Sequence, residues 1–168
     1  MTKTFKVAHH RFSFDIPDGH PLWEKTAQYA PFEEPEGEDV LFTIRVVDSL
    51  EHGAMKQVYG GNEEEGQPVI LLYEGEDSWM METAPVTGRP FSGRMVSDKA
   101  FSHADLLVLR PSEALFALNN AAMLMFAFAT APYDTLEMHA SVIANGGKAF
   151  LFLAKSGTGK STHSSQWL

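Results

Sequence analysis

The stretch that decides the fold of this chain is AFLFLAKSGTGKST, residues 149–162. It begins with five apolar residues, 149–153, which have the length and composition of a buried strand. A glycine-rich loop follows directly, and Lys160-Ser161-Thr162 then opens a segment that can form a helix. This order of strand, glycine-rich loop, Lys-Ser and helix is typical of a loop that binds phosphate.

The spacing follows the pattern Gly, four residues, Gly-Lys-Ser/Thr, with Ala154 in place of the first glycine. Gly157 and Gly159 lack a Cβ, so their backbone N–H groups can approach phosphate oxygens closely. The helix that follows adds a partial positive charge. We therefore expect Lys160 to reach the β- and γ-phosphates of ATP, and the Ser161 hydroxyl to hold Mg²⁺. The alternative is a glycine-rich turn followed by an ordinary surface lysine.

A hairpin is predicted immediately before the loop. Apolar and polar residues alternate from Leu136 to Val142, which is the period of a strand, so we expect a strand over 136–144. Asn145-Gly146 is a preferred pair for a tight hairpin turn, because both central residues need positive φ. The strands 136–144 and 149–153 are therefore predicted to pair antiparallel.

A long apolar helix is predicted over residues 112–130, which contain neither Gly nor Pro and are dominated by Ala, Leu and Met. Pro111 suits the first turn, and Pro132 helps to end the helix. The longest unbroken apolar run, 121–129, is far shorter than the roughly 20 residues that cross a bilayer. A helix that is apolar on nearly every side must be covered, so we expect a central element or an oligomer contact.

The leading region, residues 1–110, is expected to be rich in β-structure. Short runs of β-branched and aromatic residues alternate there with Gly, Pro and Asp turn signals. Strands are predicted at Phe12–Ile16, Val40–Val47, Val69–Tyr73, Trp79–Glu82 and Leu106–Leu109.

Composition excludes several classes of function. The formal net charge of −9 argues against nucleic acid and anionic membranes as partners. The acidic runs 33–39 and 63–65 carry or adjoin turn residues and are expected to be solvated loops. The absence of cysteine excludes disulfides, thiol catalysis and zinc–cysteine sites. No apolar stretch follows the N-terminal residues, so no signal peptide is expected, and we predict a cytoplasmic protein.

The predicted hairpin, together with residues 156–162, resembles the family of HPr serine kinase/phosphorylases and phosphoenolpyruvate carboxykinases. His139-Ala140-Ser141 is similar to a His-Gly stretch of the HPr kinases, and residues 126–135 and 157–164 resemble uncharacterised HPr-kinase-like proteins of bacteria. The resemblance covers about residues 112–168. It implies an α/β fold (α+β, with a mixed sheet), in which residues 111–168 are the beginning of a P-loop kinase-like domain. The β-rich region expected over 1–110 is compatible with this resemblance.

The resemblance also implies roles for individual residues. Ser156, Gly157, Thr158, Gly159, Lys160, Ser161 and Thr162 would bind the triphosphate of ATP, and Ser161 would help to hold Mg²⁺. His139 would lie near the transferred phosphate as a second catalytic residue beside Lys160. The alternative for His139 is a strand histidine bonded to a backbone carbonyl. We expect His163 to be a structural or surface residue and Trp167 to close the core. The phosphate acceptor, a serine or a small-molecule hydroxyl, is not identified.

Phosphoryl transfer also needs acidic residues that hold Mg²⁺ and position the acceptor. In the related families these follow the P-loop, whereas only seven residues follow Ser161 here. We therefore expect a chain truncated after the loop, inactive by itself and able to form homo-oligomers through exposed apolar surface. A non-catalytic binding or regulatory module with a vestigial P-loop is the competing hypothesis, and a carboxykinase is a weaker one.

Overall fold

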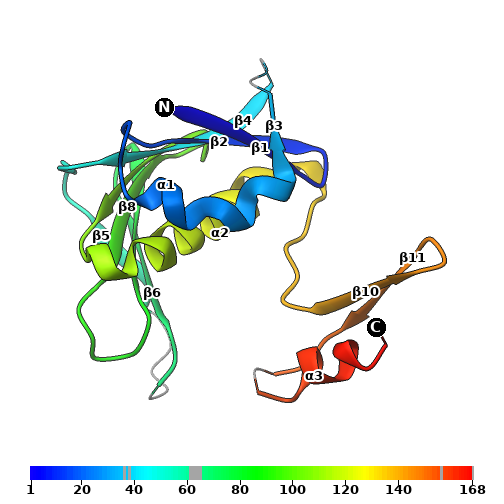
Figure 1. Ribbon diagram of the computed structural model, residues 1–168. Coiled ribbons are helices and arrows are strands. Elements are labelled where there is room, and N and C mark those ends of the chain that lie inside the picture. The colour runs from blue at the N-terminus through cyan, green and yellow to red at the C-terminus, as the bar shows by residue number, and fades with distance from the viewer. Residues whose placement is uncertain (36, 38, 61–65, 156, 168) are drawn as a thin grey trace. The chain divides into compact units, whose positions relative to one another are not determined.

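The computed structural model describes residues 1–35, 37, 39–60, 66–155 and 157–167. The chain divides into two compact units, Met1–Thr135 and Leu136–Leu168. The content is mixed, with one large mixed sheet and few helices, which confirms the predicted α+β class at this coarse level (Figure 1).

Within the described residues, the first unit is built on a nine-stranded sheet of order β3-β1-β2-β4-β9-β8-β7-β6-β5. The strands are β1 (Thr2–Val7), β2 (His10–Asp15), β3 (Glu33–Glu34), β4 (Val40–Val47), β5 (Lys56–Gly60), β6 (Val69–Glu74), β7 (Ser78–Ala84), β8 (Gly93–Asp98) and β9 (His103–Val108).

Three neighbouring strands at the middle of the sheet run parallel. β4 pairs parallel with β2 on one side and with β9 on the other, whereas the remaining pairs are antiparallel. Parallel neighbours cannot be joined by a tight turn, so long connections separate them. The first contains the helix α1 (Leu22–Lys25) and the 3₁₀ segment η1 (Thr26–Phe32), and the second contains strands β5 to β8.

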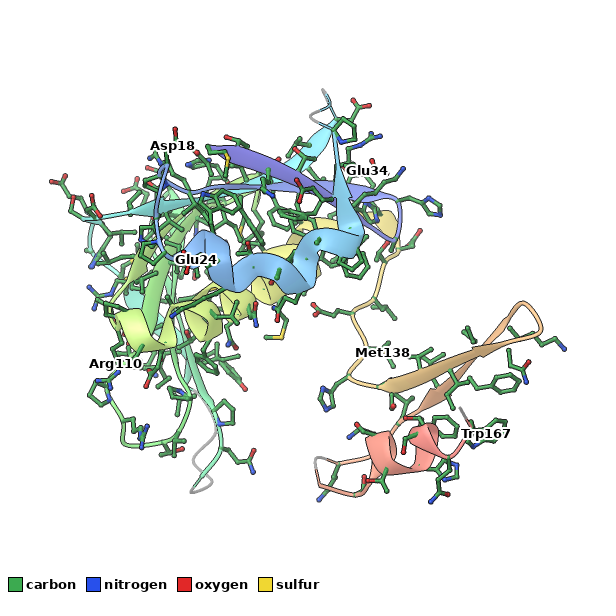
Figure 2. The ribbon with its side chains drawn as sticks, viewed as in Figure 1. Asp18, Glu24, Glu34, Arg110, Met138 and Trp167 are labelled. Atoms are coloured by element: carbon green, nitrogen blue, oxygen red, sulfur yellow. The ribbon has the colours of Figure 1, made fainter. Side chains whose placement is uncertain are left out.

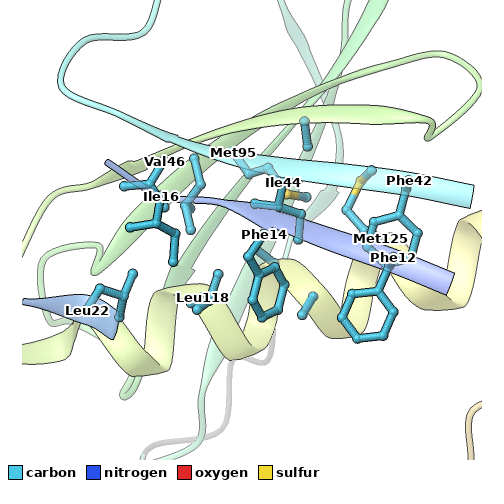
Figure 3. Packing of buried hydrophobic residues seen from close by; sticks show 14 of the residues in the cluster. Phe12, Phe14, Ile16, Leu22, Phe42, Ile44, Val46, Met95, Leu118 and Met125 are labelled. Carbon is cyan, nitrogen blue, oxygen red and sulfur yellow. The ribbon is translucent and has the colours of Figure 1, made fainter. Parts of the chain in front are cut away.

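Helix α2 (Ala114–Thr130), which follows the 3₁₀ turn η2 (Pro111–Glu113) and precedes η3 (Ala131–Tyr133), packs against strands β4, β7, β8 and β9. Figure 3 shows Leu118 and Met125 of α2 facing Phe14, Ile44 and Met95 of the sheet. Each fully buried side chain of this size contributes on the order of 2 kcal/mol. The layer between sheet and helix is therefore the main core of the first unit.

The segment made of α1 and η1 lies along α2 (Figure 1). Asn119 in the middle of α2 accepts hydrogen bonds from Gln28 Nε2 at 2.8 Å and from the Tyr29 hydroxyl at 2.9 Å. The Asn119 side chain therefore links the mostly apolar helix α2 to η1, in the connection between β2 and β4. This contact explains why an asparagine is tolerated there, because its carbonyl oxygen is satisfied.

The helix was predicted to be buried, and eight of its seventeen residues are. The stretch Pro111–Tyr133 is nevertheless apolar and long enough, on length and composition alone, to span a membrane. The core helix of a soluble protein passes the same test. Cytoplasmic localisation therefore remains a prediction.

The five strands predicted in the leading region are present, with ends shifted by up to three residues except in β4. Strands β1, β3, β5 and β8 were not predicted. The chain divides into its two compact units after Thr135, so α2 belongs to the same unit as the strands before it. The boundary expected after residue 110, between a β-rich region and a P-loop domain, remains a prediction.

A close approach between β8 and α2 makes Gly93 sensitive to substitution. A Cβ added at Gly93 would lie 2.7 Å from the Cβ of Ala117. Because both atoms are held by backbone, we expect Gly93→Ala to destabilise the first unit by about 1–3 kcal/mol. Chemical denaturation measures the free energy of unfolding of Gly93→Ala and of the control variant Gly53→Ala. Gly53 is a suitable control because a Cβ at this position meets nothing within 4 Å. Equal stability of the two variants would contradict the packing.

The hairpin that joins β1 and β2 turns through Ala8 and His9, whose φ angles are +48° and +71°. Non-glycine residues are strained there, whereas Asn-Gly suits a two-residue hairpin. We expect the double variant Ala8→Asn, His9→Gly to be stabilised by about 1 kcal/mol, seen as a higher melting temperature. His52→Gly, which changes an exposed histidine, should give no stabilisation. An unchanged or lower melting temperature in the turn variant would be evidence against the strain.

Candidate phosphate-binding site

The second unit begins with a hairpin that leads into the glycine-rich loop. Strand β10 (Ser141–Asn145) pairs antiparallel with β11 (Lys148–Phe152), with Ile143 opposite Phe150. The turn consists of Gly146 and Gly147, with φ of +58° and +72°. The antiparallel hairpin was predicted correctly, but its turn lies one residue later than the expected Asn145-Gly146. Two glycines adopt positive φ without strain, so Asn145 stays in the strand.

One face of the hairpin carries helix α3 (Lys160–Ser165). The hydroxyl oxygens of Ser141 on β10 and Ser164 on α3 lie 2.6 Å apart. The ring of Phe152 meets the edge of His163 at a centroid distance of 4.8 Å. These contacts fix the helix against the strand that feeds the loop, so both ends of the loop are held.

Trp167 completes this aromatic cluster from beyond the end of α3 (Figure 2). Its ring lies 6.1 Å from the centroids of both Phe150 and Phe152. The side chain remains 53% exposed. It covers the hairpin only in part, so the expectation that Trp167 closes the core is wrong: the ring packs on the hairpin but is not buried.

The loop backbone depends on two glycines. Gly157 and Gly159 have φ of +80° and +84°, and Gly159 lies at the N-terminal cap of α3. A Cβ at either position would meet nothing within 4 Å, so the need for glycine comes from the dihedral angle and not from crowding. His163 N–H donates to the Gly159 carbonyl at 2.8 Å, which closes the first helical turn.

The Lys160 side chain folds back over the loop. Its ammonium donates to the carbonyl oxygens of Ala154 at 2.8 Å and Lys155 at 3.1 Å. The Thr158 hydroxyl donates to the same Lys155 carbonyl at 2.8 Å. An ammonium has three N–H donors, so one remains for an anion while the loop keeps this form.

A surface hollow of about 400 Å³ lies beside the ammonium. It is lined by the end of β11 and Ala154, and by four residues of the loop and α3: Thr158, Gly159, Lys160 and His163. The hollow thus brings together the end of the strand, the loop and the first turn of the helix. His163, which was expected to be a structural or surface residue, is exposed and packs on Phe152, and it also lines this hollow.

The charge of the second unit differs from that of the whole chain. Residues 136–168 contain three lysines, Lys148, Lys155 and Lys160, and a single acidic residue, Glu137. The whole chain carries −9, so its acidity resides in the first unit. A local excess of positive charge favours anionic ligands. This asymmetry was visible in the sequence but is hidden by the overall charge.

The predicted binding residues Gly157, Thr158, Gly159, Lys160, Ser161 and Thr162 occupy the loop and the first turn of α3. Ser156 lies outside the described residues. Ser161 and Thr162 are exposed, as a residue that meets a ligand from solvent must be.

His139 is not joined to this group by any contact between described residues. The strand predicted over 136–144 begins only at Ser141, so His139 lies on the preceding irregular segment and is exposed. Alternation alone favoured a strand there, but a strand also needs a pairing partner, and β11 pairs only as far as Ser141. The catalytic role of His139 remains a prediction.

Among the described residues, no group of three or more His, Asp or Glu side chains is arranged to hold a metal ion. A Mg²⁺ ion bound with a nucleotide takes many of its ligands from phosphate and water, so it does not need such a cage. The Mg²⁺ role of Ser161 therefore remains a prediction.

Comparison with known proteins gives no family assignment. No family model matches the chain, and neither a curated protein nor a solved structure matches it.

The docking of α3 on the hairpin can be tested through Phe152. We expect Phe152→Ala to remove the contact with His163 and to speed hydrogen exchange at the amides of α3, because so short a helix depends on packing. Val142→Ala is the control, since Val142 is 56% exposed and alternation places it on the opposite face. Equal protection of α3 in the two variants would show that the aromatic contact does not hold the helix.

Proposed function

We propose that the second unit binds the phosphates of ATP, as part of a phosphotransferase of the HPr-kinase-like kind. The observation that carries the proposal is the loop itself: Gly157 and Gly159 hold positive φ, and the Lys160 ammonium is bonded over the same loop beside an open hollow. This combination of glycine backbone and lysine is suited to a nucleotide's phosphates.

The lysine-rich composition of residues 136–168 supports the same proposal. Three lysines against one glutamate give the unit a positive charge that attracts a triphosphate, whereas an ordinary surface turn needs no such excess. The antiparallel hairpin that precedes the loop agrees with the resemblance on which the kinase class rests.

The roles that we propose for individual residues follow from the chemistry of phosphoryl transfer. Lys160 would neutralise charge on the β- and γ-phosphates, and the residues from Ser156 to Thr162 would surround them. Ser161 would offer its hydroxyl to Mg²⁺, which supplies charge neutralisation when bound with ATP. His139 would lie toward the acceptor, a serine or small-molecule hydroxyl, and would orient it or stabilise charge.

We expect the 168-residue chain to bind nucleotide without turning it over. Glu137 is the sole acidic residue among 136–168. Transfer needs carboxylates for a second Mg²⁺ contact and for the acceptor proton. Binding, not turnover, is therefore the direct readout of this proposal.

A calorimetric titration of the chain with ATP in the presence of Mg²⁺ tests the proposed ATP binding. We expect saturable binding of ATP and weaker binding of AMP, which lacks the β- and γ-phosphates. Lys160→Ala should weaken ATP binding by about tenfold or more, because it removes a charged hydrogen-bond donor.

Lys148→Ala is the matched control, because it removes an exposed lysine from the hairpin at the far end of β11 from the loop. Its ATP affinity should fall by much less than that of Lys160→Ala, because Lys148 adds only to the general positive charge of the unit. Absence of saturable ATP binding, or equal affinity in the Lys160→Ala and unchanged chains, would refute the proposal and favour a non-catalytic module.

A further inference from the structure

A second cavity lies in the first unit, where the parallel strands end. The carboxyl ends of β4 and β9 meet the crossover that follows β2, and a cavity of about 350 Å³ opens between them. The cavity thus lies outside the carboxyl ends of two parallel strands, which is the end of the sheet at which open α/β folds bind their ligands. The volume falls in the range of roughly 300–1,000 Å³ that is common for small-molecule sites.

The inner wall of this cavity is apolar and well buried. Val46 at the end of β4, Leu22 of α1 and Ala114 at the start of α2 line it, and they are 6%, 1% and 4% exposed. Val108 of β9 adds a further aliphatic surface. The wall is set by the same core that joins α2 to the sheet, so the cavity is preformed and suits an aliphatic or aromatic group.

Three polar residues, His20, Lys25 and Asp48, also line the cavity. Their positions come from different elements, namely the crossover, helix α1 and the end of β4. Lys25 Nζ donates one hydrogen bond, to the Pro111 carbonyl at 3.3 Å, so further N–H donors remain.

The imidazole of His20 is oriented by the backbone of Leu22. Its Nδ1 accepts the Leu22 N–H at 3.1 Å, which places the hydrogen of the neutral ring on Nε2. Asp48 has no hydrogen bond or ion pair with any other residue that the structure describes. The mouth of the cavity therefore combines donors on Lys25 and His20 with an acidic acceptor on Asp48.

We propose that this cavity binds a small apolar amino acid as its zwitterion. The carboxylate of the ligand meets Lys25 and His20, its ammonium meets Asp48, and its side chain enters the apolar interior. A simple carboxylic acid would leave Asp48 unmatched and repelled, and a simple amine would do the same to Lys25. A ligand that bears both charges offers a partner to each group.

The site is independent of the phosphate loop, because all of its residues belong to the first unit. Calorimetric titration of the full chain with L-leucine and L-phenylalanine tests it. The matched probes are isocaproate, which is leucine without its amino group, and isoamylamine, which lacks its carboxylate. We expect saturable binding of at least one amino acid and at least about tenfold weaker binding of both leucine analogues.

The variants Lys25→Met and Asp48→Asn should each weaken amino-acid binding by about tenfold, since each removes a charged partner. Both positions are exposed, so circular dichroism should show an unchanged fold. Lys56→Met, on β5 outside the cavity, and Lys160→Ala, in the other unit, should bind as the unchanged chain does.

Failure of both amino acids to saturate the protein would overturn the proposal. Equal affinity for isocaproate and leucine would overturn it as well, because the ammonium would then have no role. Retention of affinity in Lys25→Met or in Asp48→Asn would show that the bound molecule lies elsewhere. None of these outcomes depends on ATP binding, so the amino-acid site and the phosphate loop are tested independently.

Discussion

The packing of helix α2 against the sheet is the constraint on which the first unit depends. The helix is apolar around most of its surface, and it is covered by strands β4, β7, β8 and β9 on one side and by α1 and η1 on another. The approach is so close at Gly93 that no side chain fits between β8 and Ala117. The first connection, which contains α1 and η1, lies against this helix, and the cavity at the carboxyl ends of β4 and β9 is lined by Leu22 of α1 and by Ala114, the first residue of α2.

The second unit is stabilised differently. It has few residues and one small cluster, in which Phe150, Phe152, His163 and Trp167 hold α3 on the hairpin. An isolated two-stranded hairpin is marginal in water, so this cluster is what gives the loop fixed ends. The glycines then supply the backbone angles and Lys160 the charge. The residues that stabilise the unit thus differ from those proposed to bind phosphate: the aromatic rings hold α3 on the hairpin, and the glycines and Lys160 form the loop.

The sequence allowed the strongest local features to be predicted. Strand β4 was predicted to the residue, because β-branched and aromatic residues fill it from Val40 to Val47. The helix was predicted within two residues, because no Gly or Pro interrupts it. Strand β1 was missed because Lys and Thr alternate there with few apolar residues, and β5 because all of its residues are exposed at the edge of the sheet. Edge strands gain little from burial, so they leave a weak pattern.

By itself, the sequence determined the order of strand, glycine-rich loop and helix around Lys160, because spacing and backbone freedom are local properties. It also determined the apolar helix and the positive charge of residues 136–168. Only the tertiary structure decided that β2, β4 and β9 run parallel, that α2 belongs with the leading strands, and that His20, Lys25 and Asp48 line one cavity. These relations join residues far apart in the chain through packing, and packing depends on the shapes of surfaces that no local pattern of residues encodes.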